Sequence, residues 1–437
     1  MLKNKMFNRF PLAILLLTAS ILTLGSCIER DIVPCPESSR LLLVYVGTDN
    51  NLSGYEQEKL QGLRDGWTGK ATDRIIAYVD KGRGADARLI EISNLAPGEQ
   101  PREIATYGTE NSASAITLAR VIDDVASMFP SDSYGLLVFS HASGWLPTGA
   151  LHDPSGGTYF PVLSPSASAA TAAAGNSSPL TQTESSEPLS RYYACGGALF
   201  EDSEILSRSI VIDGTDEMAL SDLAAAIPDG MFDYIAFEAC FMAGVEVAWE
   251  LRHKAPVILA SSAEIVHPGF APVYSSATIK LLGGNLVGFG QSVWGHTLTY
   301  AENNPQRSAT YSVIRTAGLE PLAAFVRTEC DFARTVDITS VQRFDRLNGH
   351  RLFFDFFDYH SRLLDTEAQR AELAQLAANC IEWKAATSEF MTQTAGLNGF
   401  AITQHSGLTT YIPQVALPGL NAAYSTLGWT NAVMGYK

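Results

Sequence analysis

The chain is poor in basic residues and in cysteine, and after its first segment it has no long apolar run. Its 437 residues contain 30 Lys and Arg against 46 Asp and Glu, a formal net charge of −16. A chain of this charge repels phosphate backbones, which excludes nucleic acid as the main partner. With 46% hydrophobic and 17% charged residues it can bury a large core, so neither intrinsic disorder nor a small disulfide-stapled scaffold is expected.

Several short motifs of known chemistry are also missing. The sequence has no HExxH, no G-x-S-x-G and no Walker loop, which excludes the zinc peptidases, α/β-hydrolases and P-loop NTPases that carry them. No Asp-rich loop has the ligand spacing of a calcium site. Residues 82–87 match GxGxxA, but period-two alternation follows instead of a helix, so we predict a hairpin there. The residues therefore predict no metal site and no cofactor.

The first 27 residues look like a bacterial lipoprotein signal. Three basic residues precede an apolar run at residues 12–24, which is shorter than the roughly 20 residues of a membrane span. The run ends in LGSC, which resembles a lipobox, so we expect a lipid on Cys27. An ordinary secretory signal with a chance cysteine is the alternative. The lipid would be the only membrane anchor of an exported protein, with the outer membrane or cell surface as candidate locations.

The other five cysteines show neither CxxC nor any repeated spacing. Export would place them in a compartment where disulfides can form. Because five is an odd number, at least one thiol should be free.

Hydrophobic periodicity predicts strands and helices that alternate along the chain. This alternation is typical of an α/β fold with a mainly parallel sheet covered on both faces. The predicted strands are residues 40–47, 73–80, 87–92, 133–140, 232–238, 255–261 and 407–413. The predicted helices are residues 56–63, 114–129, 219–226 and 242–252, with further helices dominating after residue 275.

Composition suggests how the mature chain is organised. We expect a tether at residues 28–39, an α/β domain at residues 40–275 and a mainly helical region at residues 276–437 packed on it. Residues 155–190 are rich in Ser, Ala, Thr and Pro and contain no Lys or Arg, which is typical of a flexible insert.

A histidine and a cysteine each follow a predicted buried strand. His141 comes after the strand that ends at Ser140, and Cys240 comes after the strand that ends near Glu238. The carboxyl ends of parallel strands form the ligand crevice of such sheets, so we expect both side chains to face one site. A helix N-terminus and a nearby imidazole favour the thiolate, which predicts a cysteine nucleophile with its base. A buried structural cysteine and a hydrogen-bonded loop histidine are the alternative.

Five blocks of sequence together resemble the clostripain-like cysteine peptidases, relatives of the caspases and gingipains. The two that contain the candidate residues are residues 140–145 (SHASGW) and residues 238–248 (EACFMAGVEVA). The other three are residues 44–52 (VYVGTDNNL), residues 260–264 (ASSAE) and residues 407–413 (GLTTYIP). They occur in the family's order across nearly the whole mature chain.

The resemblance implies a caspase-like three-layer α/β/α sandwich and an endopeptidase that cuts after Arg or Lys. His141 would be the general acid and base and Cys240 the nucleophile. Backbone N–H groups near Ala142, Gly144 and Cys240 would stabilise the oxyanion. Polypeptides would be the substrates, and we expect a monomer. Clostripain itself depends on calcium, which leaves calcium open as a cofactor.

Two further groups of residues follow from the resemblance. Members of the family often mature by cleavage between the His and Cys blocks, and Arg191 and Arg208 are the candidate processing sites in that interval. An Arg or Lys pocket needs an acid, for which Glu238 and Glu264 are candidates. Asp49, at the end of the first strand, could also line the cleft, although an Asx-turn is the alternative role.

Two departures from the family pattern leave other functions open. Ala142 stands where the family typically has Gly, and Glu238 stands where it has Asp. The first alternative is therefore a catalytically impaired relative that binds peptides at the cell surface. The second is an adhesin or structural lipoprotein with no chemistry in the cleft.

Overall fold

The computed structural model describes residues 39–150 and 210–435, apart from residues 83, 97, 215, 346–350 and 392–398. The lipobox cysteine Cys27, the Ser- and Ala-rich insert and the candidate processing sites Arg191 and Arg208 lie outside the described residues. Among the helices of the described part, none combines the length and the apolar character needed to cross a bilayer.

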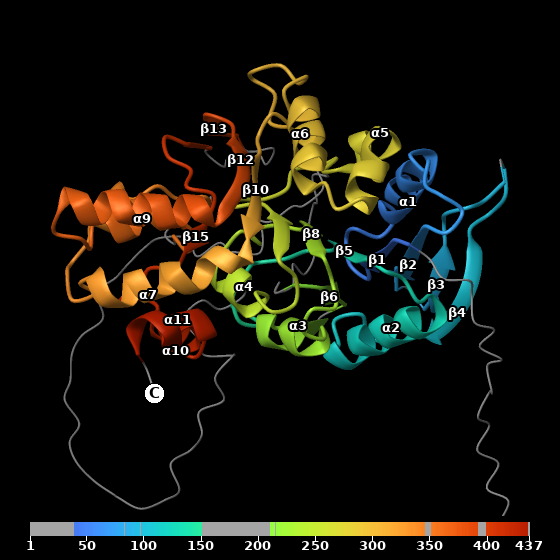
Figure 1. The fold of residues 1–437 in the computed structure, drawn as a ribbon, viewed down its shortest axis with the longest axis horizontal. Helices are drawn as coiled ribbons and strands as arrows, with labels where there is room; N and C mark the ends of the chain where they lie inside the picture. Colours follow the sequence, from blue (N-terminus) through green and yellow to red (C-terminus); the bar gives the residue numbers. More distant parts are fainter. Residues whose placement is uncertain are drawn as a thin grey trace, which may run out of the picture. The chain divides into compact units, whose positions relative to one another are not determined.

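A nine-stranded sheet runs through the middle of the fold (Figure 1). Its five central strands are parallel, and the strands at both edges are antiparallel to their neighbours. From one edge to the other the strands are β12 (Ile381–Ala386), β10 (Thr310–Arg315), β9 (Val257–Ala260), β8 (Tyr234–Glu238), β5 (Tyr134–Phe139), β1 (Leu41–Gly47), β2 (Arg74–Asp80), β3 (Ala87–Glu91) and β4 (Arg102–Gly108).

The central strands are buried on both faces because their side chains alternate between two apolar layers. In β1, Leu41, Leu43 and Tyr45 enter one core, whereas Leu42 and Val44 enter the other. This alternation is the reason that parallel strands have continuous apolar sequences.

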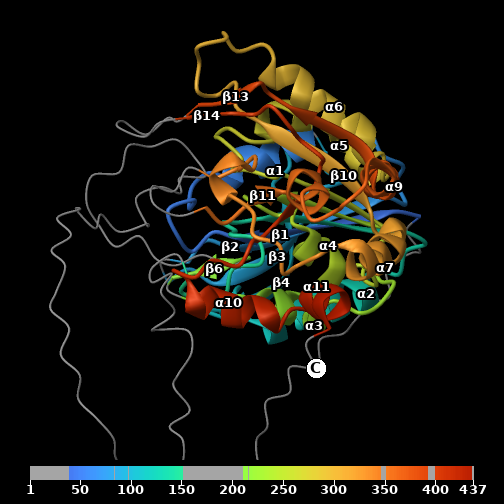
Figure 2. The same cartoon turned by 90° about the vertical axis from the view of Figure 1, so that its left-hand side faces the viewer.

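Helices cover both faces of the sheet, as Figures 1 and 2 show. One face carries α1 (Glu56–Asp65), α5 (Ala271–Leu282) and α6 (Leu286–Thr297). The other face carries α2 (Ala115–Met128), α3 (Leu220–Ala226), α4 (Val245–Glu250), α7 (Leu319–Glu329) and α11 (Gly428–Met434). The predicted three-layer α/β/α sandwich is therefore confirmed.

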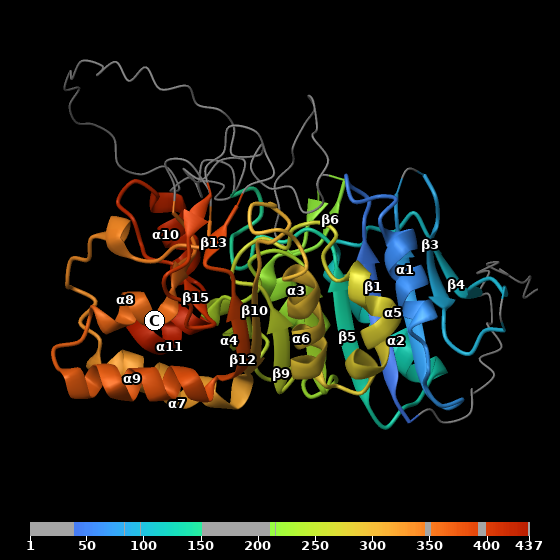
Figure 3. The ribbon, with the colours of Figure 1, turned by 90° about the horizontal axis from the view of Figure 1, so that it is seen from above.

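The region after residue 275 contributes to the central sheet as well as adding helices. It supplies β10 and β12, and Figure 3 shows α7 and α9 beyond the β12 edge. Its remaining helices are α8 (Phe356–Ser361), α9 (Glu367–Asn379) and α10 (Pro418–Ser425), with short 3-10 turns η2 (Thr316–Gly318) and η3 (Ile338–Ser340). Two-residue strands pair as β6 (Ile212–Asp213) with β7 (Asp216–Glu217), β11 (Phe354–Asp355) with β15 (Thr409–Thr410), and β13 (Glu389–Phe390) with β14 (Phe400–Ala401).

The chain order of the strands marks where a site can form. From β1 the chain continues to β2 on one side, and β5 then lies on the other side of β1. In open parallel sheets the ligand crevice lies outside the carboxyl ends of strands at such a switch of direction. Strands β1, β5 and β8 all end at this edge, so the loops that follow them lie next to one another.

Candidate active site

The register of two neighbouring strands brings the predicted histidine and cysteine to the same level. Strands β5 and β8 are parallel, and Phe139 is opposite Glu238 in the last pair of the ladder. His141 follows Phe139 by two residues, and Cys240 follows Glu238 by two residues. Because adjacent strands lie about 4.8 Å apart, the two loops begin as immediate neighbours. Both residues are buried, with exposures of 2% for His141 and 1% for Cys240.

The loops that follow β5 and β8 stay in contact because Gly144 has no side chain. Gly144 adopts a φ of +62°, and a Cβ at this position would lie 2.6 Å from the Phe241 carbonyl oxygen. Phe241 itself has a φ of +60°, in a region that few non-glycine residues adopt. Its ring stacks on Phe353, with centroids 4.3 Å apart. The backbone beside Cys240 is therefore held in an unusual conformation by packing.

Asn51, in the loop after β1, orients the His141 ring. The Asn51 side-chain oxygen lies within hydrogen-bonding distance of His141 Nε2. An oxygen can only accept, so this contact requires Nε2 to donate. The neighbouring Asn50 fixes the loop by accepting the Leu52 N–H (2.8 Å) and donating to Ile212 O (3.0 Å). A third residue thus sets the tautomer of the histidine, as in Cys-His-Asn sites.

The Cys240 sulfur is held by the loop that follows β9. Ile265 donates its N–H to Cys240 Sγ at 3.4 Å, and the Phe241 N–H donates to Ala263 O at 3.0 Å. Cys240 is in a disulfide, whereas the thiols of Cys330 and Cys380 are free. A sulfur in a disulfide becomes a nucleophile only after reduction.

The free thiols of Cys330 and Cys380 confirm the prediction of at least one unpaired cysteine. Burial raises the pKa of each to about 12. Neither thiol is therefore ionised to a useful extent near neutral pH.

The candidate oxyanion donors lie in the backbone directly after His141. The N–H groups of Ala142 and Gly144 donate no hydrogen bond to another residue in the described part of the chain. Ala142 is not in the left-handed region, so the methyl group that replaces the family's usual Gly causes no backbone strain. Its side chain is buried in the apolar core.

Segment 407–413 near the C-terminus supports the loops after both strands. Trp145, four residues after His141, packs on Tyr411 and Tyr424 with ring centroids 4.8 and 5.0 Å away. Thr409 donates its N–H to Ala243 O at 2.9 Å. The predicted strand at residues 407–413 is only two residues long, but it ties the site to the C-terminal region.

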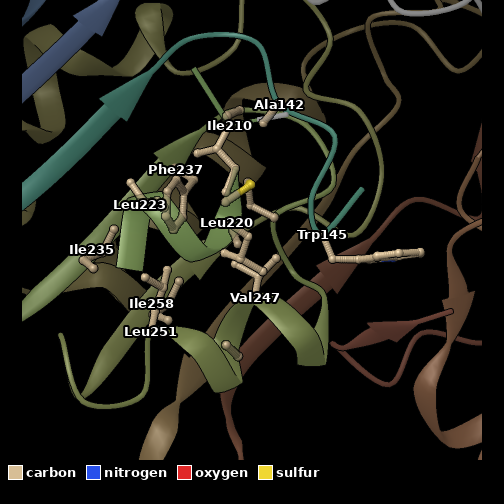
Figure 4. Close-up of a cluster of buried hydrophobic side chains, with 14 of the residues drawn as sticks. Ala142, Trp145, Ile210, Leu220, Leu223, Ile235, Phe237, Val247, Leu251 and Ile258 are labelled. Atoms are coloured by element: carbon tan, nitrogen blue, oxygen red, sulfur yellow. The ribbon is translucent and has the colours of Figure 1, made fainter. Parts of the chain in front are cut away.

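An apolar core lies behind the site and keeps its loops in place. Figure 4 shows Ala142 at one end of a cluster of buried apolar side chains. They are Ile235 and Phe237 of β8, Leu220 and Leu223 of α3, Val247 of α4, Leu251 directly after α4, and Ile258 of β9. Close packing of this kind limits the movement of the loops that it supports.

Glu238 is buried and fully engaged by neighbouring groups. Lys59 of α1 forms an ion pair with Oε1, to which the Phe270 N–H also donates at 2.7 Å. The Tyr274 hydroxyl donates to Oε2 at 2.6 Å. Glu238 borders a small cavity, but its oxygens already have these partners.

The other two predicted substrate-binding acids do not line this cavity. Asp49 packs against Gly82, where any Cβ would overlap its carboxyl group. It belongs to a group with Asp80 and Asp213, where burial and the neighbouring Asp80 raise the pKa of Asp213 to about 7. Glu264 precedes Ile265 in the loop that holds Cys240. Neither Asp49 nor Glu264 is among the described residues that line the cavity beside Glu238.

Lys59 and Asn51 are the two residues that sequence reasoning missed. Asn51 lies in the TDNN segment, where Asp49 was the preferred candidate. Lys59 gives no signal in the sequence because its partner Glu238 is 179 residues away. No cluster of three or more metal-ligating side chains occurs among the residues that the structure describes.

Comparisons with known proteins identify the family and the fold of the chain. The family model described as the Clostripain family matches residues 44–154 and 192–328, more than half of the chain. An inactive zymogen C11 protease from Parabacteroides distasonis has 26% sequence identity and a TM-score of 0.70, over 91% of this chain and 99% of its own.

Two structures of a secreted C11 cysteine protease from Bacteroides thetaiotaomicron have the same fold. The complex with an irreversible peptide inhibitor has 22% identity and a TM-score of 0.68, over 91% of this chain and 100% of its own. The second has 19% identity and a TM-score of 0.69, over 91% and 99%. The caspase-like α/β sandwich is thereby confirmed. A search of curated proteins found no match. The family match, covering both the histidine and the cysteine blocks, shows that this chain belongs to the clostripain family of cysteine peptidases.

Proposed function

We propose that this protein is an exported, lipid-anchored cysteine endopeptidase in which Cys240 is the nucleophile and His141 the general base and acid. The observation that supports the proposal most strongly is the β5–β8 register, which places the two residues at the ends of adjacent parallel strands. The Asn51–His141 contact adds the third group of a nucleophile, base and orienting residue.

The geometry supports acyl transfer in two steps. His141 takes the Cys240 proton, and the thiolate attacks the carbonyl carbon of the peptide bond. The N–H groups of Ala142 and Gly144 would donate to the oxygen that becomes negatively charged. His141 then protonates the departing amine, which leaves a thioester on Cys240. Water, deprotonated by His141, releases the new carboxylate and restores the thiol.

The substrates would be polypeptides. The Bacteroides thetaiotaomicron relative binds a peptide inhibitor, and both it and the Parabacteroides distasonis relative are described as proteases. Cleavage after Arg or Lys stays a prediction of the family resemblance. So do the monomeric state and any use of calcium.

Export and anchoring rest on the signal sequence and on Cys27. One related protease is a secreted protein, which supports export. Metabolic labelling with a radioactive fatty acid tests the anchor, because the wild type should incorporate the label and Cys27→Ser should not. Equal labelling of both would contradict the assignment of Cys27.

The reaction is tested by hydrolysis of a pooled fluorogenic peptide library in reducing buffer, before and after limited trypsin treatment. The wild type should release fluorophore, whereas Cys240→Ala and His141→Ala should lose at least about 10³-fold in kcat/KM. Cys330→Ala is the matched control, since it removes another thiol and should retain activity. Equal hydrolysis by Cys240→Ala would exclude the proposed nucleophile. No hydrolysis by any protein would favour the catalytically impaired, peptide-binding alternative.

A further inference from the structure

A small cavity lies beside the proposed catalytic pair. It has a volume of about 30 Å³, about the space of one or two water molecules. Phe139 and Glu238, which precede His141 and Cys240 by two residues each, contribute to its wall. Ile265, whose N–H donates to the Cys240 sulfur, contributes as well. This position makes the cavity the candidate pocket for the substrate side chain that precedes the cut bond.

Lys59 of this chain forms part of the cavity wall. Lys59 reaches from α1 with its side chain 11% exposed, and its ammonium group forms an ion pair with Glu238. The same nitrogen lies 3.4 Å from Pro268 O and 4.3 Å from the centroid of the Phe139 ring. The ammonium group thus has a carboxylate, a carbonyl and an aromatic face as partners. A basic substrate side chain would need these same partners.

Glu238 cannot recruit a second cation. Its side chain is 2% exposed, and its oxygens accept hydrogen bonds from Lys59, Phe270 and Tyr274. A Cβ on Gly269 would overlap Glu238 Oε1, so the wall on that side is closed as well. Bringing a guanidinium or ammonium group next to Lys59 would bury a cation without a carboxylate of its own, which is costly.

The remaining polar group in the wall adds no negative charge. His267 lies in the loop before Pro268, and its ring contacts Tyr55 with centroids 5.1 Å apart. Burial and the nearby Lys59 lower the pKa of His267, which favours the neutral ring. The positive charge of Lys59 and the negative charge of Glu238 cancel. The wall of this small cavity therefore has no net charge.

We infer that Lys59 is a specificity-determining residue that excludes Arg and Lys, so that the enzyme cleaves after small, uncharged residues such as Ala, Ser or Gly. The inference rests on the proposed peptidase function, because it assigns the cavity to the side chain that precedes the cut bond. It replaces the basic preference predicted from the family with one set by an ion pair that is internal to this chain.

The test is a peptide library that varies only the residue before the cut bond, applied to the full-length protein in reducing buffer. The wild type should cleave after Ala, Ser or Gly with a kcat/KM at least tenfold higher than after Arg or Lys. In Lys59→Ala the Glu238 carboxylate loses its cation and the lysine side chain no longer fills the wall. This variant should gain at least tenfold in cleavage after Lys or Arg.

Two further variants make the result specific. The double variant Lys59→Met/Glu238→Gln removes both charges and keeps the volume of both side chains. It should retain the wild-type preference, and it provides a test if Lys59→Ala does not fold. Lys280→Ala is the matched control, since the Lys280 ammonium is hydrogen-bonded to Ser292 on another part of the same face and is absent from the cavity wall. It should leave the profile unchanged.

The outcomes separate the inference from the function on which it rests. Preferred cleavage after Arg or Lys by the wild type would overturn the role of Lys59 and leave the peptidase proposal intact. A folded Lys59→Ala that keeps the small-residue preference would also overturn it. No cleavage of any library peptide, even after trypsin treatment, would instead contradict the peptidase function.

Discussion

Single residues set both the orientation of the His141 ring and the separation of the loops around it. Asn51 faces His141 Nε2, and Gly144 allows the two active-site loops to touch. Neither residue would carry out chemistry itself. Substitutions at these positions therefore test how the site is positioned.

Removal of the Asn51 carboxamide should impair catalysis more than binding. In Asn51→Ala the His141 ring loses the acceptor that fixes its tautomer, so kcat should fall about tenfold or more with little change in KM, equal to a barrier increase of at least ~1.4 kcal/mol. Asn51→Asp keeps the acceptor and adds a negative charge that stabilises the imidazolium ion. It should retain activity and shift the acidic limb of the kcat/KM profile to higher pH. Identical pH profiles for the wild type and Asn51→Asp would show that Asn51 does not act through the histidine.

Gly144→Ala should disrupt the contact between the loops that follow β5 and β8. The new methyl group would meet the Phe241 carbonyl oxygen at 2.6 Å as well as forcing a positive φ. Gly230→Ala is the matched control, because Gly230 has a φ of +66° and open space around it. Gly144→Ala contains both the clash and the strain of a positive φ, whereas Gly230→Ala contains only the strain, which costs about 1 kcal/mol. Comparing the thermal unfolding and the kcat/KM of the two variants therefore isolates the effect of the clash. Equal losses in both variants would mean that close approach at Gly144 does not matter.

At the residue level the sequence predicted His141 and Cys240 but not their partners. The two could be found because each directly follows a buried strand. Asn51 competed with Asp49 in one polar turn, and only the three-dimensional path of the loop shows which side chain reaches the histidine. The Lys59–Glu238 pair joins α1 to β8, a relation that no local pattern reports.

Among the elements, helix α4 and strand β15 are joined by a buried carboxylate. Glu246 Oε1 accepts hydrogen bonds from Thr410 Oγ1 (2.8 Å), Tyr411 N (3.0 Å) and the Tyr424 hydroxyl (3.0 Å). This contact holds the C-terminal segment against the helix that follows Cys240. Burial outweighs these hydrogen bonds and raises the pKa of Glu246 from 4.5 to about 7.

The raised pKa predicts that folding stability falls as the pH rises. Between pH 4.5 and about 7 the folded protein holds a proton on Glu246 that the unfolded chain releases, so unfolding becomes easier across this window, by on the order of 3 kcal/mol for this group. Glu246→Gln should reduce the loss of unfolding free energy between pH 5 and pH 8, as measured with denaturant. Part of the slope should remain, because burial also raises the pKa of Asp345 to about 7.

A surface glutamate in an equivalent helix position provides the control for this effect. Glu367 lies in the first turn of α9 with its side chain 90% exposed, so Glu367→Gln should leave the pH dependence unchanged. If Glu246→Gln showed the same slope as the wild type, the carboxylate would not be protonated in the folded state.

The secondary structure was predictable for strands in which nearly every residue is buried. Strands β1, β2, β5 and β8 coincide closely with the predicted apolar runs, because parallel central strands are buried on both faces. Strands β4 and β12 were not predicted, since edge strands expose part of each face. In β10 the polar residue Thr310 is buried because it is hydrogen-bonded to Ser261 (2.9 Å), which hydrophobicity alone cannot reveal.

For the whole molecule, the specificity of the site bears on how the chain matures. The interval between His141 and Cys240 contains the candidate processing sites Arg191 and Arg208. If the site rejects Arg, it cannot cut the chain after these residues, and any cleavage there would need another protease. Intact-mass measurement of the purified wild type after incubation in reducing buffer should show no cleavage at either arginine. Wild-type cleavage there that is absent from Cys240→Ala would show self-processing and contradict the assignment.

The central claim is that one of the cysteines, Cys240, acts as a nucleophile activated by His141. The most direct measurement is mass-spectrometric mapping of the adduct formed by an irreversible peptidyl thiol reagent after reduction of the protein. One equivalent should attach to Cys240, because burial keeps the thiols of Cys330 and Cys380 protonated, and His141→Ala should slow the labelling strongly. An adduct on another cysteine, or a rate that does not depend on His141, would contradict the account.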